Sequence, residues 1–279
     1  MSSRFRSILD RAASAGGPSR TARSAPRVVL GTGGSGTRAV AEAMIAAGVY
    51  LGADRNRASD SLAYKPFLVR WSKPYVAESG WVQAVERDPG ADVTPPPEIT
   101  ADLEAAISRQ REGIPAEDAL WGWKNPRTSN LLPVLNAVAP DALTAQLVRD
   151  GRDMAYSKNQ NQLEDCAAIL PEELREAPLP VRSIALWSRM NLATAAYMRH
   201  LKGDGHLVLR YEDLCAEPQL HLGRLLEHLQ IPAAPEVIER AAEGVKLSSG
   251  AGRWKDAPAG ELQEVERAGK PALREFGYM

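Results

Sequence analysis

The chain has 279 residues, of which 44% are hydrophobic, and its 34 basic and 35 acidic residues leave a net charge of −1. This length suits one α/β domain with a full core, and the near-neutral balance gives no global reason to expect nucleic acid as a partner. Two cysteines and four histidines, in no metal-ligand spacing, argue against a disulfide framework, a redox motif or a metal site.

The first predicted element is an N-terminal basic tail over residues 1–26. Six arginines and a single acid, Asp10, lie in the first 27 residues, without the apolar core of a secretory signal. A transit peptide is one interpretation; a disordered tail with a short helix over residues 4–13 is the one we favour. No apolar run is long enough to span a membrane, so we expect one cytoplasmic domain over residues 27–279.

Ordered structure is expected from Arg27 onward, as strands that alternate with helices. The pattern predicts a strand at 28–30, a glycine-rich turn at 32–36, a helix over 37–47 and a strand at 49–51. A helical region over 60–87, broken by Pro74, is followed by a loop over 88–100, a helix over 101–112, a strand at 120–124 and a helix over 129–138. The remaining predicted elements are strands at 143–148 and 206–211 and helices from about 150, over 181–201, over 217–230 and over 235–243. Such alternation predicts a three-layer α/β fold with a central parallel sheet, whose ligand binds at the carboxyl ends of the strands.

The strongest single motif is the segment GTGGSGTR at residues 31–38, directly after the first strand. Glycines allow backbone N–H groups to curl around an anion, and the N-terminus of the following helix adds unpaired N–H groups and a positive dipole end. Phosphate or sulfate is the natural ligand; the alternative is a tight strand–helix turn that binds nothing.

Two common nucleotide-binding motifs fit this loop poorly. Gly31 and Gly36 have the spacing of an NTPase phosphate loop, but Thr37 replaces its lysine and Arg38 its magnesium-binding hydroxyl. The loop glycines match a dinucleotide fingerprint loosely, with Asp54 as the required acid. The sequence thus argues against ATP or GTP hydrolysis.

A second phosphate site is indicated after the strand at 143–148. Arg149 ends that strand and offers a planar guanidinium, and Ser157, about two helical turns further on, offers a hydroxyl. Two separate phosphate sites indicate a ligand with two phosphorylated ends.

Four motifs in this order resemble those of the sulfotransferases that use 3′-phosphoadenosine 5′-phosphosulfate (PAPS). They are Ser35-Gly36-Thr37, Val148–Ser157, Tyr211-Glu212-Asp213-Leu214 and Gly252-Arg253-Trp254-Lys255, and the resemblance covers roughly residues 27–256. It implies a fold similar to P-loop NTPases and a PAPS donor without a metal. The binding residues it implies are Gly33, Gly34, Ser35, Gly36, Thr37 and Arg38 around the 5′-phosphosulfate, Arg149 and Ser157 at the 3′-phosphate, Tyr211 as a brace, and Arg253, Trp254 and Lys255 over the nucleotide.

The segment WGWKNPR at residues 121–127 is similar to the Lys-x-Pro segment of the tyrosylprotein and carbohydrate branch of this family. There the lysine faces the sulfuryl group, so the resemblance makes Lys124 a catalytic candidate that stabilises charge on the leaving oxygen. The alternative is a solvated lysine at a strand end.

The sequence departs from the family just before Ser35, where Gly34 stands in place of a frequent basic residue. Arg38 either supplies that charge from the first helical turn or lies on the outer face.

The acceptor must lose a proton. Members of the family that this chain resembles use Glu or His soon after the first helix, and no histidine precedes His200, so the resemblance implies a carboxylate as the base. Asp60 is the first candidate and Asp54 the second; Asp60 also fits as the N-cap of the next helix. Lys124, Asp60 and Ser157 are thus the candidate catalytic residues. The acceptor, a small molecule or glycan, would be shaped by residues 53–118 and the amide-rich residues 158–162.

These features predict a sulfotransferase that moves a sulfuryl group from PAPS to an acceptor hydroxyl or amine. A kinase-like phosphotransferase on the same fold and a non-catalytic nucleotide-binding protein are the alternatives.

Overall fold

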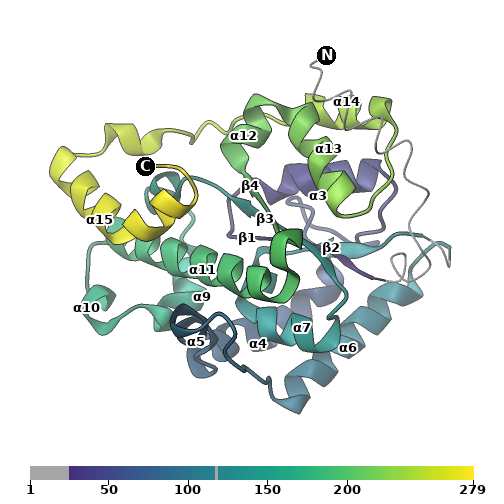
Figure 1. Ribbon diagram of the computed structural model, residues 1–279, viewed down its shortest axis with the longest axis horizontal. Coiled ribbons are helices and arrows are strands. Elements are labelled where there is room, and N and C mark those ends of the chain that lie inside the picture. Colours follow the sequence, from purple (N-terminus) through teal and green to yellow (C-terminus); the bar gives the residue numbers. More distant parts are fainter. Residues whose placement is uncertain (1–24, 117–118) are drawn as a thin grey trace.

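A computed structural model describes residues 25–116 and 119–279, and its centre is a four-stranded parallel sheet (Figure 1). The strands lie in the order β2-β1-β3-β4, with β1 at Arg27–Gly31, β2 at Gly122–Lys124, β3 at Leu143–Val148 and β4 at Leu207–Arg210. Residues Val28, Val29 and Leu30 of β1 are all buried. Such a continuous apolar run is expected where helices cover both faces of a parallel sheet.

Three helices cover one face of the sheet. They are α3 (Thr37–Ala46), α13 (Pro218–His228) and α14 (Pro235–Glu243). Met44 of α3 and Leu225 of α13 are buried in one cluster with Val29 and Leu147 of the sheet. This layer anchors α3, so the N-terminus of α3 is fixed at the end of β1.

A larger set of helices covers the other face. They are α4 (Lys65–Glu78), α5 (Trp81–Arg87), α6 (Pro97–Glu112), α7 (Leu132–Val138) and α11 (Leu179–Lys202). Trp123 of β2 stacks on Tyr64 at 4.5 Å between ring centroids, and both rings are buried. The shorter helices α8 (Gly151–Ala155), α9 (Asn161–Cys166), α10 (Glu172–Arg175) and α12 (Tyr211–Ala216), and the C-terminal α15 (Ala259–Glu275), complete the helices described.

The predicted three-layer arrangement with a central parallel sheet is confirmed. None of the helices in the described part of the chain is both long and apolar enough to cross a lipid bilayer. The predicted tail helix at residues 4–13 lies outside the described residues.

Two local predictions are wrong. Residues 49–51 form no strand, because only Tyr50 makes an isolated parallel bridge, to Trp121. Pro74 does not break its helix, since α4 continues to Glu78 and the interruption comes at Gly80, with φ of 62°. Burial of the residues after the proline keeps the chain helical past it.

Other boundaries differ because tertiary packing and turn chemistry decide them. The helix predicted from 101 begins at Pro97, which suits the first helical position, and the helix predicted from 129 is a 3₁₀ segment (Pro126–Leu131) before α7 begins. Tyr211 begins a helix instead of ending a strand. Helices α9, α10 and α15 were not predicted.

Candidate functional site

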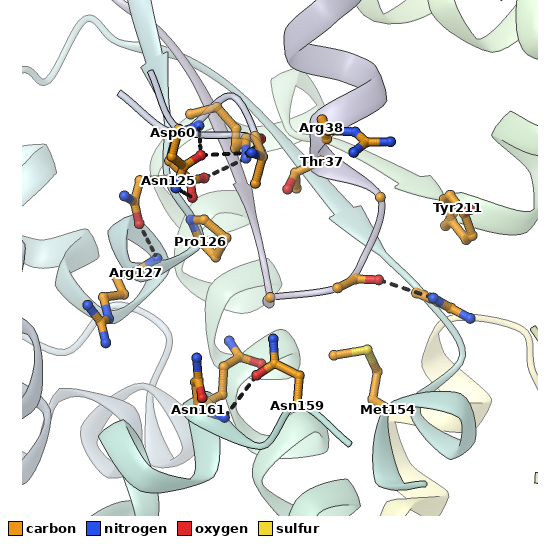
Figure 2. Close-up of a pocket in the computed structure, with 18 of the residues that line it drawn as sticks. Thr37, Arg38, Asp60, Asn125, Pro126, Arg127, Met154, Asn159, Asn161 and Tyr211 are labelled. Carbon is orange, nitrogen blue, oxygen red and sulfur yellow. Dashed lines mark hydrogen bonds and ion pairs between the residues drawn. The ribbon is translucent and has the colours of Figure 1, made fainter. Parts of the chain in front are cut away.

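A cavity of about 640 Å³ opens at the carboxyl ends of the strands (Figure 2). Each strand contributes to it through the residues that follow: the glycine loop after β1, Lys124 at the end of β2, Arg149 after β3 and Tyr211 after β4. These four segments therefore meet at one edge of the sheet. The predicted site residues that line the cavity are Gly33, Gly34, Gly36, Thr37, Arg38, Asp60, Lys124, Arg149 and Tyr211.

The glycine loop has a backbone that only glycine adopts readily. Gly34 and Gly36 have φ of 88° and 87°, and a Cβ on Gly36 would lie 2.2 Å from the ring of Tyr211. No side chain caps the N-terminus of α3. Ser35 is buried beneath the loop, where its hydroxyl donates to the carbonyl of Thr32 at 2.6 Å. Ser35 therefore holds the loop, and the residues at the start of α3 line the cavity, where a helix N-terminus favours an anion.

Lys124 forms a buried ion pair with Asp60. Its Nζ lies 2.5 Å from Oδ1 of Asp60 and also donates to the carbonyl of Ala58. The lysine side chain is 2% exposed and that of Asp60 is 18% exposed. Burial lowers the pKa of the Lys124 ammonium, while its hydrogen bond to Asp60 opposes that shift. Lys124 is therefore not a solvated lysine at a strand end.

The second reading of Asp60, as a helix cap, does not fit the structure. The 3₁₀ segment that follows (Leu62–Tyr64) has Ser61 at its N-cap, and no side chain caps it. The Asp60 carboxylate instead accepts hydrogen bonds from Lys124 and from Nδ2 of Asn56, the latter at 2.7 Å. Asp54 is exposed and is not among the described residues that line the cavity.

Arg149 contacts the glycine loop. Its guanidinium donates to the carbonyl of Gly34 at 3.3 Å and to Asp153 at 2.9 Å, and it lies 5.2 Å from the ring centroid of Tyr211. Its Nε is buried and has no hydrogen-bond partner among the described residues. The cavity is thus lined by two basic groups that follow different strands, Lys124 at the end of β2 and Arg149 after β3.

Tyr211 acts as a brace, as the sequence predicted. Its hydroxyl donates to the carbonyl of Lys246 at 2.9 Å and accepts from the N–H of Ser248 at 3.0 Å. The neighbouring Glu212 accepts hydrogen bonds from the N–H of Asp150 and the hydroxyl of Tyr278. These contacts tie the end of β4 to the end of β3 and to the C-terminal segments.

Several predicted residues lie apart from the cavity lining. Helix α8 ends at Ala155, so Ser157 is in the turn beyond it and not two helical turns along; its hydroxyl accepts from the N–H of Asn159. Arg253 donates to the carbonyls of Gly250 and Tyr156. None of these, nor Trp254 or Lys255, is among the described residues that line the cavity.

Trp254 packs on protein in this structure. Its ring lies 3.8 Å from the guanidinium carbon of Arg152 and 5.8 Å from Nζ of Lys255. Trp187 is buried against Phe276 and Tyr278, although it also reaches the cavity wall.

Arg38 shows the outer-face arrangement that the sequence left open. It pairs with Glu42 at 3.5 Å, with a side chain that is 64% exposed, and it points away from Asp60 in Figure 2. It lines only the rim of the cavity, so the charge expected in place of Gly34 is not supplied from inside the loop.

The structure also adds lining residues that sequence reasoning missed. Lys65 and Ser183 come from α4 and α11, Met154 from α8, and Lys246 and Ser248 from the segment after α14. Their positions depend on tertiary packing, and no local motif marks them. Of the amide-rich residues 158–162, those at 159–162 line the cavity, and Asn159 lies near Met154 in Figure 2.

Comparison with known proteins was made at the level of sequence and of fold. No curated protein sequence matches the chain. The sulfotransferase domain of the curacin biosynthetic pathway shares 15% identity with a TM-score of 0.56, over 91% of this chain and 98% of its own. The sulfotransferase domain of the Synechococcus olefin synthase shares 16% identity with a TM-score of 0.50, over 95% of this chain and 97% of its own. A sulfotransferase of Mycobacterium avium shares 12% identity with a TM-score of 0.51, over 95% of this chain and 80% of its own.

At these identities the solved structures show a common fold, and the family assignment comes from the sequence. The family model described as "Sulfotransferase family" matches residues 6–235, which is most of the chain. The resemblance seen in the motifs is therefore confirmed at the level of the family. The chain belongs to the sulfotransferase family and is an enzyme that transfers a sulfuryl group.

Proposed function

We propose that the enzyme takes the sulfuryl group from PAPS and transfers it to a hydroxyl or amine of a small polar molecule or glycan. The main support is one cavity lined by the glycine loop, the N-terminus of α3 and the Arg149 guanidinium, which donates to the loop carbonyl of Gly34 at 3.3 Å. A donor with two phosphorylated ends offers one anionic group to the loop and another to the Arg149 guanidinium. Thr37, at the position of the NTPase lysine, favours this donor over ATP.

The roles of the residues follow from where they lie. The loop N–H groups would hold the phosphosulfate, and Arg149 would bind the 3′-phosphate. The acceptor oxygen attacks sulfur while Asp60 takes its proton; the bond from sulfur to the bridging oxygen breaks, and its electron pair stays on the 5′-phosphate. Lys124 would stabilise that growing negative charge. The scheme needs no metal ion, since Lys124 and the loop supply the positive charge.

The acceptor side of the cavity favours a neutral polyhydroxylated compound. Carboxamides of Asn56, Asn125, Asn159, Asn161 and Gln162 line it. The cation Arg127 is paired with Asp165 at 2.6 Å, as Lys124 is with Asp60, so a carboxylate neutralises each of these two cations. Amides offer donors and acceptors to hydroxyl groups.

The experiment that tests this function is a transfer assay with ³⁵S-labelled PAPS. We expect label to pass to sugars, glycans or other polyols in preference to apolar alcohols of similar size. Equal or better transfer to apolar alcohols would contradict the acceptor class, and no transfer to any hydroxyl or amine would contradict the function.

Replacing Arg149 by alanine is expected to weaken binding of adenosine 3′,5′-bisphosphate by about 30-fold, or ~2 kcal/mol. This loss of binding free energy is small for a charge-assisted contact, because part of the guanidinium is already bonded to Asp153 and Gly34. Affinity for adenosine 5′-monophosphate, which lacks the 3′-phosphate, should hardly change. Titration calorimetry with both nucleotides measures the difference.

The matched control is Arg70→Ala, which also removes an arginine paired with an aspartate but lies far out on the exposed side of α4. It should bind both nucleotides normally. Equal losses for both nucleotides in Arg149→Ala would show that Arg149 does not bind the 3′-phosphate.

A further inference from the structure

Asp60 sits in a tight turn that one side chain organises. Oδ1 of Asn56 accepts from the N–H groups of Ala58 at 2.8 Å and Asp60 at 3.0 Å, and its Nδ2 donates to Oδ2 of Asp60 at 2.7 Å. Asn56 N–H also donates to the carbonyl of Asp60 at 3.2 Å. The amide of Asn56 therefore bonds both the backbone of the turn and the carboxylate at its end.

The same turn shapes the surroundings of Lys124. The carbonyl of Ala58, which accepts from Nζ of Lys124, lies between the two N–H groups that Asn56 holds. Ser59 has φ of 61°, a left-handed conformation that a residue with a side chain adopts only when its surroundings hold it there. The turn is thus a constrained support for both members of the Lys124–Asp60 pair.

We propose that Asn56 is a positioning residue that aims the Asp60 carboxylate at the acceptor. Lys124 bonds Oδ1 of Asp60 and Asn56 bonds Oδ2, so the carboxylate is held from both ends and cannot rotate freely. Asn56, Ala58 and Asp60 all line the cavity, and a carboxylate with one bond to each oxygen keeps further lone pairs for an acceptor there. This inference rests on the proposed role of Asp60 as the base.

The two halves of the Asn56 amide can be tested separately. Asn56→Asp keeps an oxygen for the two backbone N–H groups, so the turn should persist. It loses the donor to Asp60 and places a second carboxylate beside it, and like charges oppose each other's ionisation. Asn56→Ala removes both halves. A role confined to the turn would leave Asn56→Asp nearly as active as the parent.

We would measure kcat, the KM for the acceptor and the pH profile of kcat in Asn56→Asp and Asn56→Ala. Each should lower kcat by about tenfold to a hundredfold, because misaligned reacting groups carry a cost of that order. In Asn56→Asp the acidic limb of the profile should also move to higher pH. Affinity for adenosine 3′,5′-bisphosphate should stay normal, which shows that the variants are folded.

The control is Asp88→Ala, which removes a similar side-chain bond to a backbone N–H, that of Gly90, in an exposed loop whose residues are not among the described lining of the cavity. It should leave kcat unchanged. Asn56→Ala should have no further effect on kcat in an Asp60→Asn background, because Asn56 acts through that carboxylate.

The outcomes separate this inference from the function on which it rests. Normal turnover in Asp60→Asn would overturn both the base and the positioning role. Slow turnover in Asp60→Asn together with an Asn56→Asp variant of normal kcat and unshifted pH profile would overturn the positioning role alone. Full additivity of Asn56→Ala and Asp60→Asn would do the same.

Discussion

Replacing Lys124 by alanine is expected to slow turnover by about 10²–10³-fold with any acceptor. The ammonium is buried at the end of β2, beside the loop proposed to hold the phosphosulfate, and the bridging oxygen gains negative charge only as the bond to sulfur breaks. An interaction that strengthens in the transition state lowers the barrier without tightening product binding. Affinity for adenosine 3′,5′-bisphosphate should therefore change little.

Lys124→Arg should restore only part of the rate, because a planar guanidinium does not place its charge where the ammonium did. The control Lys73→Ala removes an exposed lysine from α4 and should be fully active. The proposed role needs Lys124 in its charged form, and burial lowers the pKa of its ammonium. As the pH rises, turnover should therefore fall at a lower pH than it would if the lysine had its ordinary pKa. Near-normal steady-state turnover in Lys124→Ala would contradict the leaving-group role.

Replacing Asp60 by asparagine is expected to slow turnover by about 10²–10³-fold, within the usual contribution of a general base. Asparagine retains an oxygen for Lys124 but cannot take the acceptor's proton. The charge-matched control is Asp54→Asn in the same loop, whose exposed side chain makes no hydrogen bond within the described part of the chain, while its backbone carbonyl accepts from the N–H of Leu62. That variant should keep its rate.

Steady-state rates across pH distinguish the two carboxylates. Asp60→Asn should lose the acidic limb of the kcat profile, and Asp54→Asn should retain it. A slow Asp54→Asn beside an active Asp60→Asn would reverse the assignment, and two active variants would mean that neither is the base.

Much of the fold could be predicted from local patterns. The strand at 143–148 and the helix at 235–243 have the predicted bounds, because each has a clear apolar period between turn residues. The tertiary environment decides the rest. Pro74 stays within a helix because Tyr75 and Val76 are buried, and α15 is held by packing on α11 that no local motif reveals.

The site was predictable to the extent that it follows strand ends. The glycine loop, Lys124 and Arg149 lie together because parallel strands end at one edge. The bond between Lys124 and Asp60 joins residues 64 apart in the sequence, so only the folded chain shows it. The donor roles of Ser157, Arg253, Trp254 and Lys255, and the tyrosylprotein and carbohydrate branch, stay predictions.

Titration calorimetry of the unmodified enzyme tests the central claim, the identity of the donor, most directly. One titration uses adenosine 3′,5′-bisphosphate in EDTA, and the other uses ATP with magnesium. The proposed donor site predicts a dissociation constant of about 1 μM or lower for the bisphosphate, equivalent to roughly −8 kcal/mol, that EDTA does not change. Tight binding of ATP that requires magnesium, with weak binding of the bisphosphate, would contradict it.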